Sequence, residues 1–483
     1  MAWNDLRDFL DELSSLDLLV RIDEPLELEL EIGAFTKYVM NRKGPALLFE
    51  NIPGCLEGFR LCSNLLSPSL PLFHSRFSVA MGLDLNTPLE ALREEFSRRL
   101  YGPPIAPIVV PAAPCKEHHI EKDDIDLFKF PGPLLRSIDG GRYLGTWHVD
   151  IAPPIDKNGV EDWGMFRHMI HDSRHLGVFI TDESKALHGV FHEYETKGKP
   201  MPMAVAIGTD PMVSVAAGIY VPHDMDEAAV AGALRLSPVK LIESHLFPDL
   251  IKVPASSEVV LEGYLLPNER WPEGDFGEGY GYTCGHRSPK PVLRVEHVTY
   301  RENPIFTMTC YGRPWDEWSV LTYVSEHCEI KRFLDIGNWD YERIGCLPPT
   351  SILIISIGDH SPGYAHTLAS ALWSGPAAHI PYIVIVEDDV DPENAEEVLW
   401  AISTRCHPQR GIQVHPNTSG SDMHPFLSHQ ERSKHTCPKI LFDATFPRHW
   451  PKGETPIVVN MENSWPDSVL SKVENLYREI FRS

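Results

Sequence analysis

Two glutamates in a glycine-rich stretch have the clearest potential for chemistry in this sequence. The stretch reads Glu273-Gly-Asp-Phe-Gly-Glu278-Gly-Tyr-Gly-Tyr282, so two carboxylates lie five residues apart among four glycines. Glycine lets a backbone adopt positive φ and approach a ligand closely, and the aromatic residues predict that the loop packs against the protein. A carboxylate held against aromatic rings has its charged form desolvated, which raises its pKa and suits it to proton transfer. An acidic surface turn is the alternative interpretation.

The cation that two such glutamates need could come from a second stretch, Asp162-Trp-Gly-Met-Phe-Arg167. Arginine stays protonated in proteins, and its planar guanidinium can hold a carboxylate through two hydrogen bonds. An arginine–glutamate pair that orients a second glutamate would form an acid/base unit in which one carboxylate is fixed and the other titrates. The sequence alone does not show whether Arg167, Glu273 and Glu278 meet.

Other polar features have simpler interpretations. The small-residue segment 213–222 could let the backbone approach a phosphate or a cation, or it could only pack a helix closely against a sheet. Glu227 stands at the start of an expected helix, where acidic residues are favoured anyway. The pair His118-His119 predicts a solvated turn, and His168 predicts packing rather than ligation. No Walker loop, no GxGxxG after a strand and no nucleophile elbow occurs.

The composition indicates a globular cytoplasmic protein without nucleic-acid or membrane partners. Of the 483 residues, 43% are hydrophobic and 23% are charged, and the formal net charge is −25. A basic surface for nucleic acid or an anionic membrane is therefore not expected. The nine cysteines include no pair at the spacing of a zinc or redox motif. Reduced thiols in the cytosol are the simplest expectation.

The hydrophobic pattern divides the chain into three regions. Residues 1–105 predict a segment of mixed helices and strands, and a proline-rich connector follows over about 102–134. Residues 106–314 contain mostly short strands with helical insertions, which predicts a barrel or a sandwich. Residues 315–483 alternate helix and strand, which predicts an α/β domain with a parallel sheet.

Two local predictions concern the ends of these regions. The runs 291–299 and 305–309 flank a short turn and predict a β-hairpin. Residues 466–481 carry apolar side chains at helical spacing, which predicts an amphipathic terminal helix that packs either at a subunit interface or on its own domain.

Several motifs, in the same order along the chain, resemble those of the UbiD family of reversible decarboxylases. They are the two stretches above, Val253-Pro-Ala-Ser-Ser-Glu-Val-Val-Leu-Glu-Gly263, and the segments Gly140–Thr146 and Pro438–Pro447. The resemblance covers nearly the whole chain. It implies an α/β (α+β) fold in which an N-terminal α/β segment and a C-terminal α/β oligomerisation domain flank a central split β-barrel that binds prenylated FMN.

The resemblance also implies roles for individual residues. Arg167, Glu273 and Glu278 fall on the family's catalytic positions, with Glu278 as the proton donor that replaces the departing carboxylate and the other two positioning it. The implied cofactor-binding set comprises Asp162, Trp163, Gly164, Met165, Phe166, Arg167, Ser184, Lys185, Ala216, Ala217, Gly218 and Glu227.

The implied metal-ligand positions depart from the family pattern. The family holds the flavin phosphate through a divalent ion, usually manganese, with a potassium ion nearby. Two of its ligand positions correspond here to Asp162, where the family usually has an asparagine, and to Glu227. The third ligand, usually a histidine, is Lys185. A charged lysine cannot ligate a metal, but it can pair with a phosphate or with the two acids. Lys185 is therefore expected to supply the positive charge, unless His188, one turn further on, reaches the site.

The implied function is non-oxidative, reversible decarboxylation of an aromatic, heteroaromatic or α,β-unsaturated acid, with prenylated FMN as the electron sink. Arg313, Trp315 and His424 fall near the substrate end of the family's pocket. The expected partners are this acid, a flavin prenyltransferase that supplies the cofactor, and further copies of the chain in a homodimer or larger homo-oligomer. The alternatives are a flavin-binding or assembly subunit without activity, and a hydrolase that uses Glu273 and Glu278 as acid and base.

Overall fold

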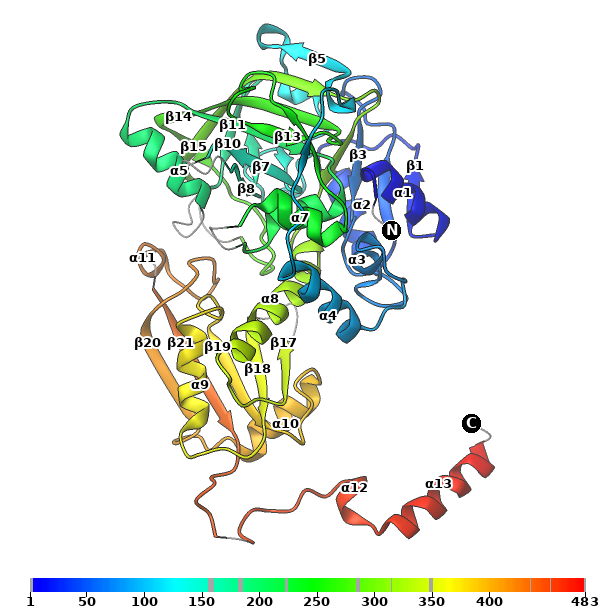
Figure 1. The fold of residues 1–483 in the computed structure, drawn as a ribbon, viewed down its shortest axis with the longest axis vertical. Helices are drawn as coiled ribbons and strands as arrows, with labels where there is room; N and C mark the ends of the chain where they lie inside the picture. Colours follow the sequence, from blue (N-terminus) through cyan, green and yellow to red (C-terminus); the bar gives the residue numbers. More distant parts are fainter. Residues whose placement is uncertain are drawn as a thin grey trace.

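The computed structural model describes residues 3–154, 160–180, 186–221, 225–283, 287–313, 315–346, 351–434, 436–451 and 453–481. Figure 1 shows an N-terminal part beside a strand-rich central part and a C-terminal domain below them. A terminal arm leaves the body of the protein.

The N-terminal part is a small sheet covered by helices. Helix α1 (Leu6–Ser15) buries one apolar stripe, because Leu6, Phe9, Leu10 and Leu13 recur at helical spacing. The side chain of Asp5 caps its first turn by accepting a hydrogen bond from the Asp8 amide. The other elements are β1 (Leu19–Ile22), α2 (Glu31–Met40), β2 (Ala46–Phe49), β3 (Arg60–Ser63), α3 (Ser75–Ala80) and α4 (Leu89–Leu100).

The central part is built on a nine-stranded sheet that forms a half-barrel, in the order β6-β9-β10-β15-β14-β11-β7-β8, with β5 paired to β15. Its long strands β14 (Val259–Glu273) and β15 (Ser288–Tyr300) pair antiparallel and bulge twice, which curves the sheet. The remaining strands are β5 (His118–Glu121), β6 (Tyr143–Gly145), β7 (His148–Ala152), β8 (Asp162–Gly164), β9 (His168–Ile170), β10 (His175–Val178) and β11 (Met201–Ile207).

Helices and a smaller sheet complete the central part. Helix α6 (Pro211–Gly218) is almost entirely buried, and its N-cap Asp210 pairs with Arg235 at the end of α7 (Glu227–Arg235). Close packing, the second interpretation of the small-residue segment 213–222, is therefore confirmed for residues 213–217. The other elements are α5 (Ala186–Thr196) and a three-stranded sheet of β4 (Ile108–Val109), β12 (Lys240–Glu243) and β13 (Lys252–Pro254).

The expected hairpin of residues 291–299 and 305–309 does not form. Strand β16 (Ile305–Met308) follows β15 after a turn, but it crosses to the N-terminal part and pairs parallel with β3. Both faces of β16 are buried, and a fully buried strand must be enclosed by two layers. The apolar pattern of such a short strand predicts that it is buried, but it does not show which strand it pairs with.

The C-terminal domain confirms the predicted α/β alternation. Its five-stranded sheet has the order β17-β18-β19-β21-β20, and β18, β19 and β21 are parallel. Asp316 and Ser319 form a capping box that starts the long helix α8 (Glu317–Ile336). The other elements are β17 (Arg343–Cys346), β18 (Ile352–Ile357), α9 (Tyr364–Trp373), β19 (Tyr382–Glu387), α10 (Ala395–Arg405), β20 (Ile412–Ser419), α11 (His429–Arg432) and β21 (Thr436–Ala444).

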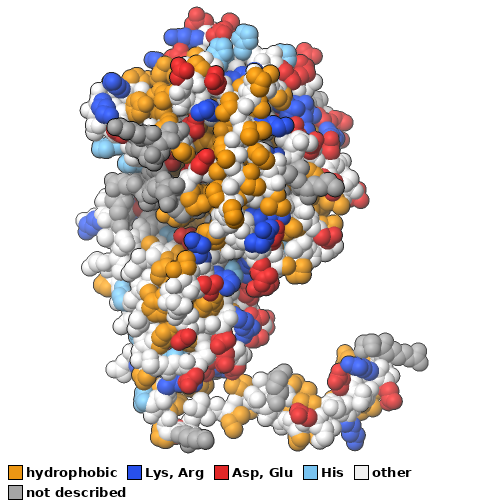
Figure 2. All heavy atoms as spheres, in the orientation of Figure 1, with side chains coloured by type: hydrophobic (Ala, Val, Ile, Leu, Met, Phe, Trp, Pro, Cys, Tyr) orange, Lys and Arg blue, Asp and Glu red, His pale blue; other side chains and the backbone are white. Residues whose placement is uncertain are grey.

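The terminal arm carries α12 (Met461–Ser464) and α13 (Asp467–Phe481) and extends away from the domain (Figure 1). The predicted helix is present, but its apolar stripe of Val469, Val473, Leu476 and Ile480 is 41–61% exposed. The arm therefore does not fold back on its own domain, and hydrophobic side chains are visible along it in Figure 2. In the described part of the chain, no helix combines the length and the apolar character that spanning a membrane requires.

Candidate active site

Arg167 joins the two glutamates that the sequence singled out. Its Nε donates to Oε1 of Glu273 at 2.9 Å and its Nη2 to Oε2 at 3.1 Å. Its Nη1 forms an ion pair with Oε1 of Glu278. The Glu273 side chain is fully buried, whereas Glu278 retains 13% exposure. The three residues thus form one unit with a fixed carboxylate and a more accessible one.

The loop that follows β14 is folded onto the protein. Gly274 has φ of 96°, a left-handed conformation that favours glycine, and turns the chain directly after Glu273. A side chain at Gly279 would overlap the indole of Trp318, so this residue lets α8 approach the loop closely. Phe276 is buried against Tyr143. A surface turn is therefore excluded for residues 273–279, although Tyr282 at the end of the loop is 57% exposed.

Two aromatic residues that the sequence did not indicate complete the surroundings of Arg167. The Tyr143 hydroxyl donates to Oε1 of Glu273 at 2.9 Å, and burial raises the pKa of Tyr143, as does the negative charge of Glu273. The Arg167 guanidinium carbon lies 3.6 Å from the centre of the Phe179 ring, a cation–π contact. Both come from strands or loops distant in the sequence from the glutamates, so only the fold brings them together.

A buried cluster of Asp150 and two histidines lies behind the segment that carries Arg167. Oδ2 of Asp150 accepts the Phe166 amide proton at 2.8 Å and lies 3.1 Å from Nε2 of His148. Oδ1 lies 3.1 Å from Nε2 of His168. Burial alone would raise the pKa of Asp150, but the charges and hydrogen bonds of the two imidazoles outweigh it and lower the pKa. His168 is packed, as expected, and it is also part of a polar network.

Sequence reasoning missed Lys290, a further cation near Arg167 and Glu273. Burial lowers the pKa of Lys290, while the charge of Glu273 raises it and that of Arg167 lowers it. Its Nζ lies 4.7 Å from the centre of the Phe179 ring, on the side chain that also contacts Arg167. In the sheet, Lys290 pairs with Trp271 two residues before Glu273, a relation that becomes visible only in the β14–β15 register.

The residues expected to bind the flavin fall on adjoining elements. Trp163 in β8 packs in one hydrophobic cluster with Ala216 and Ala217 of α6, and Met165 packs against that cluster. A methyl group at Gly218 would lie 3.6 Å from Cε of Met165, so the end of α6 closely approaches the segment 162–167. Gly164 completes β8, and Phe166 is anchored by Asp150. Ser184 and Lys185 lie outside the described residues.

Asp162 and Glu227 are close enough to repel each other. Burial raises the pKa of Glu227 to about 8, and the negative charge of Asp162 contributes to this shift. Glu227 is 9% exposed at the first turn of α7. Two acids in such surroundings favour a cation, because a positive charge would offset both the desolvation and the repulsion. The donor set therefore fits a bound cation.

Two of the three residues expected at the substrate end contact the loop that carries Glu278. The His424 ring lies 5.1 Å from that of Tyr280, and Tyr280 also meets Trp318 at 5.2 Å. Arg313 packs against Gly281. Trp315 instead lies beside Phe73, with ring centres 6.0 Å apart, and thus on the side of the N-terminal part. The C-terminal domain, through His424, therefore reaches the loop that carries Glu278.

Family models of 3-octaprenyl-4-hydroxybenzoate carboxy-lyase match three stretches: its N-terminal domain over residues 10–96, its Rift-related domain over 108–314 and its C-terminal domain over 347–444. The chain belongs to the UbiD family. The family resemblance and the split-barrel fold are thereby confirmed, and the protein is a decarboxylase of the carboxy-lyase class.

Similar proteins include two curated decarboxylases from bacteria. The phenolic acid decarboxylase of Streptomyces sp. (strain D7) is 32% identical and aligns over 92% of this chain and 93% of its own. The pyrrole-2-carboxylic acid decarboxylase of Pseudomonas aeruginosa is 27% identical over 98% of both chains. The chain thus spans nearly the full length of these relatives.

Solved structures agree with this assignment. The closed form of the vanillic acid decarboxylase from Sedimentibacter hydroxybenzoicus has a TM-score of 0.87 and 28% identity, with full coverage of both chains. The UbiD-class enzyme HmfF of Pelotomaculum thermopropionicum was solved with FMN and, in an evolved dimeric form, with prFMN. These two structures have TM-scores of 0.79 and 0.77 at 26% identity, and they cover 95% of this chain and 97% and 99% of their own.

Proposed function

We propose that this UbiD-family protein decarboxylates an aromatic or heteroaromatic acid and that Glu278 donates the proton that replaces the lost carboxyl group. The observation that carries the proposal is the Arg167 guanidinium between Glu273 and Glu278. The two acids lie in different surroundings. Glu273 is buried and held by two hydrogen bonds, whereas Glu278 is partly accessible. The phenolic and pyrrole acids of the relatives support the substrate class.

The protein's part in the reaction is orientation, exclusion of water and one proton. Loss of CO2 from an sp² carbon leaves a carbanion, and prenylated FMN, when bound, supplies the electron sink that this carbanion needs. Arg167 holds Glu273 in place through two hydrogen bonds and steers the Glu278 carboxyl group, which gives its proton to the substrate carbon. Tyr143 shields Glu273 from bulk water, and Phe276 and Phe179 shield Arg167.

The cofactor would be held by β8, the segment 165–167, the end of α6 and the start of α7. Asp162 and Glu227 would hold a cation that neutralises the flavin phosphate. We propose that Lys185 supplies this charge in place of the manganese ion of the family, with a potassium ion near the same elements. Metal analysis of the purified protein checks this proposal, since one equivalent of manganese per chain would contradict it.

Expression with a flavin prenyltransferase, the proposed cofactor supplier, provides the main test. The absorbance spectrum and the mass of the released cofactor should identify prenylated FMN, and the loaded protein should release CO2 from a phenolic or pyrrole carboxylic acid. A flavin-binding subunit without activity would carry the cofactor but would not exchange substrate protons with solvent. A hydrolase would bind no flavin. Either result would contradict the proposed function.

We further propose that the chain assembles in the cytoplasm as a homodimer or a larger homo-oligomer through the terminal arm. The exposed apolar stripe of α13 and the dimeric form of HmfF support this proposal. Light scattering after chromatography should show an assembly for the full chain and a smaller species when Val473 and Leu476 are both replaced by serine. An unchanged mass in that variant would contradict a role for the arm.

A further inference from the structure

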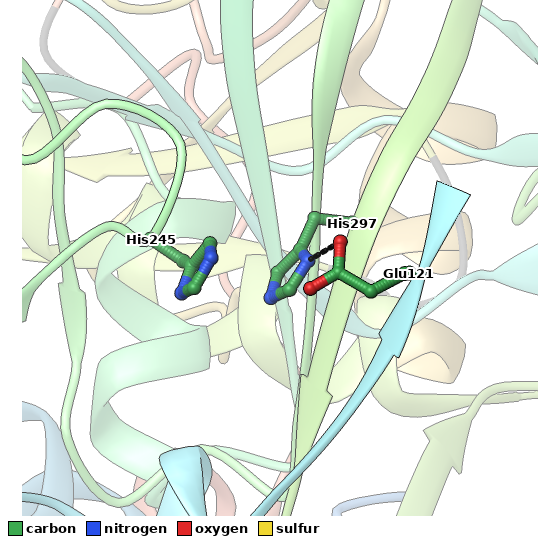
Figure 3. Close-up of side chains that lie close together, drawn as sticks. All are labelled: Glu121, His245 and His297. Carbon is green, nitrogen blue, oxygen red and sulfur yellow. Dashed lines mark ion pairs between the residues drawn. The ribbon is translucent and has the colours of Figure 1, made fainter. Parts of the chain in front are cut away.

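We propose that Glu121, His245 and His297 form a binding site for a divalent transition metal ion of the zinc class, on the outside of the half-barrel. The three side chains come from three separate segments (Figure 3): β5, the loop after β12, and β15. One ligand atom from each lies within 4.8 Å of the other two. None of the three belongs to the proposed flavin or catalytic residues.

The sheet register brings the first two ligands together. Glu121 in β5 lies directly opposite His297 in β15, and Nδ1 of His297 is 3.4 Å from Oε2 of Glu121. Directly opposed residues of an antiparallel pair have their side chains on one face of the sheet. His119, two residues before Glu121, lies on the same face, and its ring stacks 5.9 Å from that of His297. The expected solvated turn at His118-His119 is thus wrong, because these residues form a paired strand.

A buried carboxylate fixes the loop that carries the third ligand. Glu262 in β14 is fully buried and accepts the backbone amide protons of His245 at 2.9 Å and Leu246 at 2.7 Å. Lys116 forms an ion pair with the same carboxylate at 3.3 Å. Glu262 therefore anchors this loop to the sheet and holds it so that the His245 side chain lies beside His297.

His297 has a ring that is prepared for a cation. It is fully buried, and among the described residues neither ring nitrogen has a hydrogen-bond partner of good geometry. A buried polar atom without a partner costs free energy that a bound ion would recover. A metal ion binds imidazole through the lone pair of a ring nitrogen, and both ring nitrogens of His297 lie in this cluster without another good partner in the parts of the chain that the structure describes.

The three side chains can bind one ion after a movement of the His245 ring. The rings of His245 and His297 are stacked 3.8 Å apart and 9° from parallel, and two parallel rings cannot both direct a lone pair at one ion. Two ligands that each lie about 2 Å from zinc are at most about 4 Å apart. The exposed His245 ring must therefore tilt away from its stacked position and shift by about 1 Å.

The ligand types select the ion. Two imidazoles and a carboxylate suit Zn²⁺, Co²⁺, Ni²⁺ or Cu²⁺, whereas Mg²⁺ and Ca²⁺ prefer sites made of oxygen atoms. Glu121 and His245 are exposed, so an ion can enter from solvent. Figure 2 shows histidine side chains gathered at the end of the molecule that carries β5. A bound ion would tie β5 and the loop after β12 to β15.

Titration of Zn²⁺ into the full-length protein tests the site. Calorimetry should find that the wild type binds one more equivalent of Zn²⁺ than His245→Ala or Glu121→Gln does. If the variants still bind that equivalent, their affinity for it should be lower by at least about tenfold. Both replaced side chains are exposed, so the variants should fold. Added Zn²⁺ should raise the melting temperature of the wild type more than that of either variant.

His118→Ala is the matched control. It removes an imidazole from the same strand, but His118 contacts Glu302 and Tyr300 outside the cluster. This variant should keep the additional equivalent, and a tetrahedral Co²⁺ spectrum should appear in the wild type and in His118→Ala only. Equal zinc stoichiometry and affinity in wild type, His245→Ala and Glu121→Gln would overturn the proposal. An equal loss in the control would overturn the assignment of these ligands.

Discussion

Arg167 and Lys439 are both buried cations, but they lie in opposite surroundings. Arg167 binds two carboxylates and contacts aromatic rings on two sides. Lys439, in β21 of the C-terminal domain, is 1% exposed and donates to the Ala378 carbonyl at 2.7 Å, and the described residues include no carboxylate that forms an ion pair with it. Burial lowers the pKa of Lys439 to about 8.

The difference separates two uses of buried charge. A guanidinium that is fully compensated by acids can stay charged at all working pH values and can hold those acids in a fixed geometry. An ammonium that no carboxylate compensates has a desolvated charge, and it loses its proton at a lower pH. Removing the first cation should damage the site, whereas removing the second should leave the fold nearly intact.

Arg167→Met should give the largest effect. It leaves Glu273 buried without its partner, and breaking a buried ion pair in this way costs about 3–5 kcal/mol. The free energy of unfolding, measured by denaturant titration, should fall by this amount, and decarboxylation should be lost. Arg270→Met is the matched control, because Arg270 holds Glu195 through the same two-pronged contact near the surface. An effect of equal size in both variants would contradict the role of burial.

Glu278→Gln should abolish most activity without a comparable loss of stability. An amide in place of the carboxyl group preserves the shape of the side chain but removes the proposed proton donor, which should cost about 10²–10⁴-fold in rate. The measurement is CO2 release by protein loaded with cofactor, together with its flavin content, which should not change. Glu269→Gln, on the same strand β14, serves as the control. Full activity of Glu278→Gln would refute the assigned proton donor.

Asp150→Asn should cost about 1–3 kcal/mol of unfolding free energy, because it weakens a buried hydrogen-bond network. It should also lower the rate by displacing the segment that carries Arg167, since Asp150 anchors the Phe166 amide. The control is Asp172→Asn, which alters a half-exposed aspartate–histidine pair with His175. If both variants unfold at the same denaturant concentration as the wild type, the network does not support the site.

Lys439→Met should have the smallest effect on activity and a distinct pH dependence of stability. The folded-state pKa of about 8 lies below the ordinary value of 10.5. Between these values the unfolded chain binds the proton that the folded chain lacks, so the wild type gains stability as pH rises from 8 to 10.5. The methionine variant should lack this gain in unfolding titrations at the two ends of the range. An identical pH dependence in both proteins would contradict the lowered pKa.

Elements with a strong local pattern could be predicted from the sequence. The helix α8 and the parallel strands of the C-terminal domain follow from apolar periodicity, which is a local property. The spacing of Arg167, Glu273 and Glu278 did not show that they meet, and only the family resemblance implied it; the structure brings the three together.

The remaining features depend on contacts between distant segments. Tyr143 and Asp150 reach the site through the sheet register, and β5 became a strand only by pairing with β15. The pairing of β16 with β3 also depends on a distant segment, since an apolar run that is buried on both faces has no periodic pattern. The terminal helix was predicted, but the direction in which it leaves the domain was not.

The position of β16 bears on how the chain is made. The first sheet consists of three strands that are complete at residue 63 and a fourth that ends at residue 308. The ribosome will therefore have synthesised most of the barrel before β16 is available to pair with the edge of β3. Until then β3 presents unpaired backbone groups, so the nascent N-terminal part is open to misassociation and needs the later sequence to protect it.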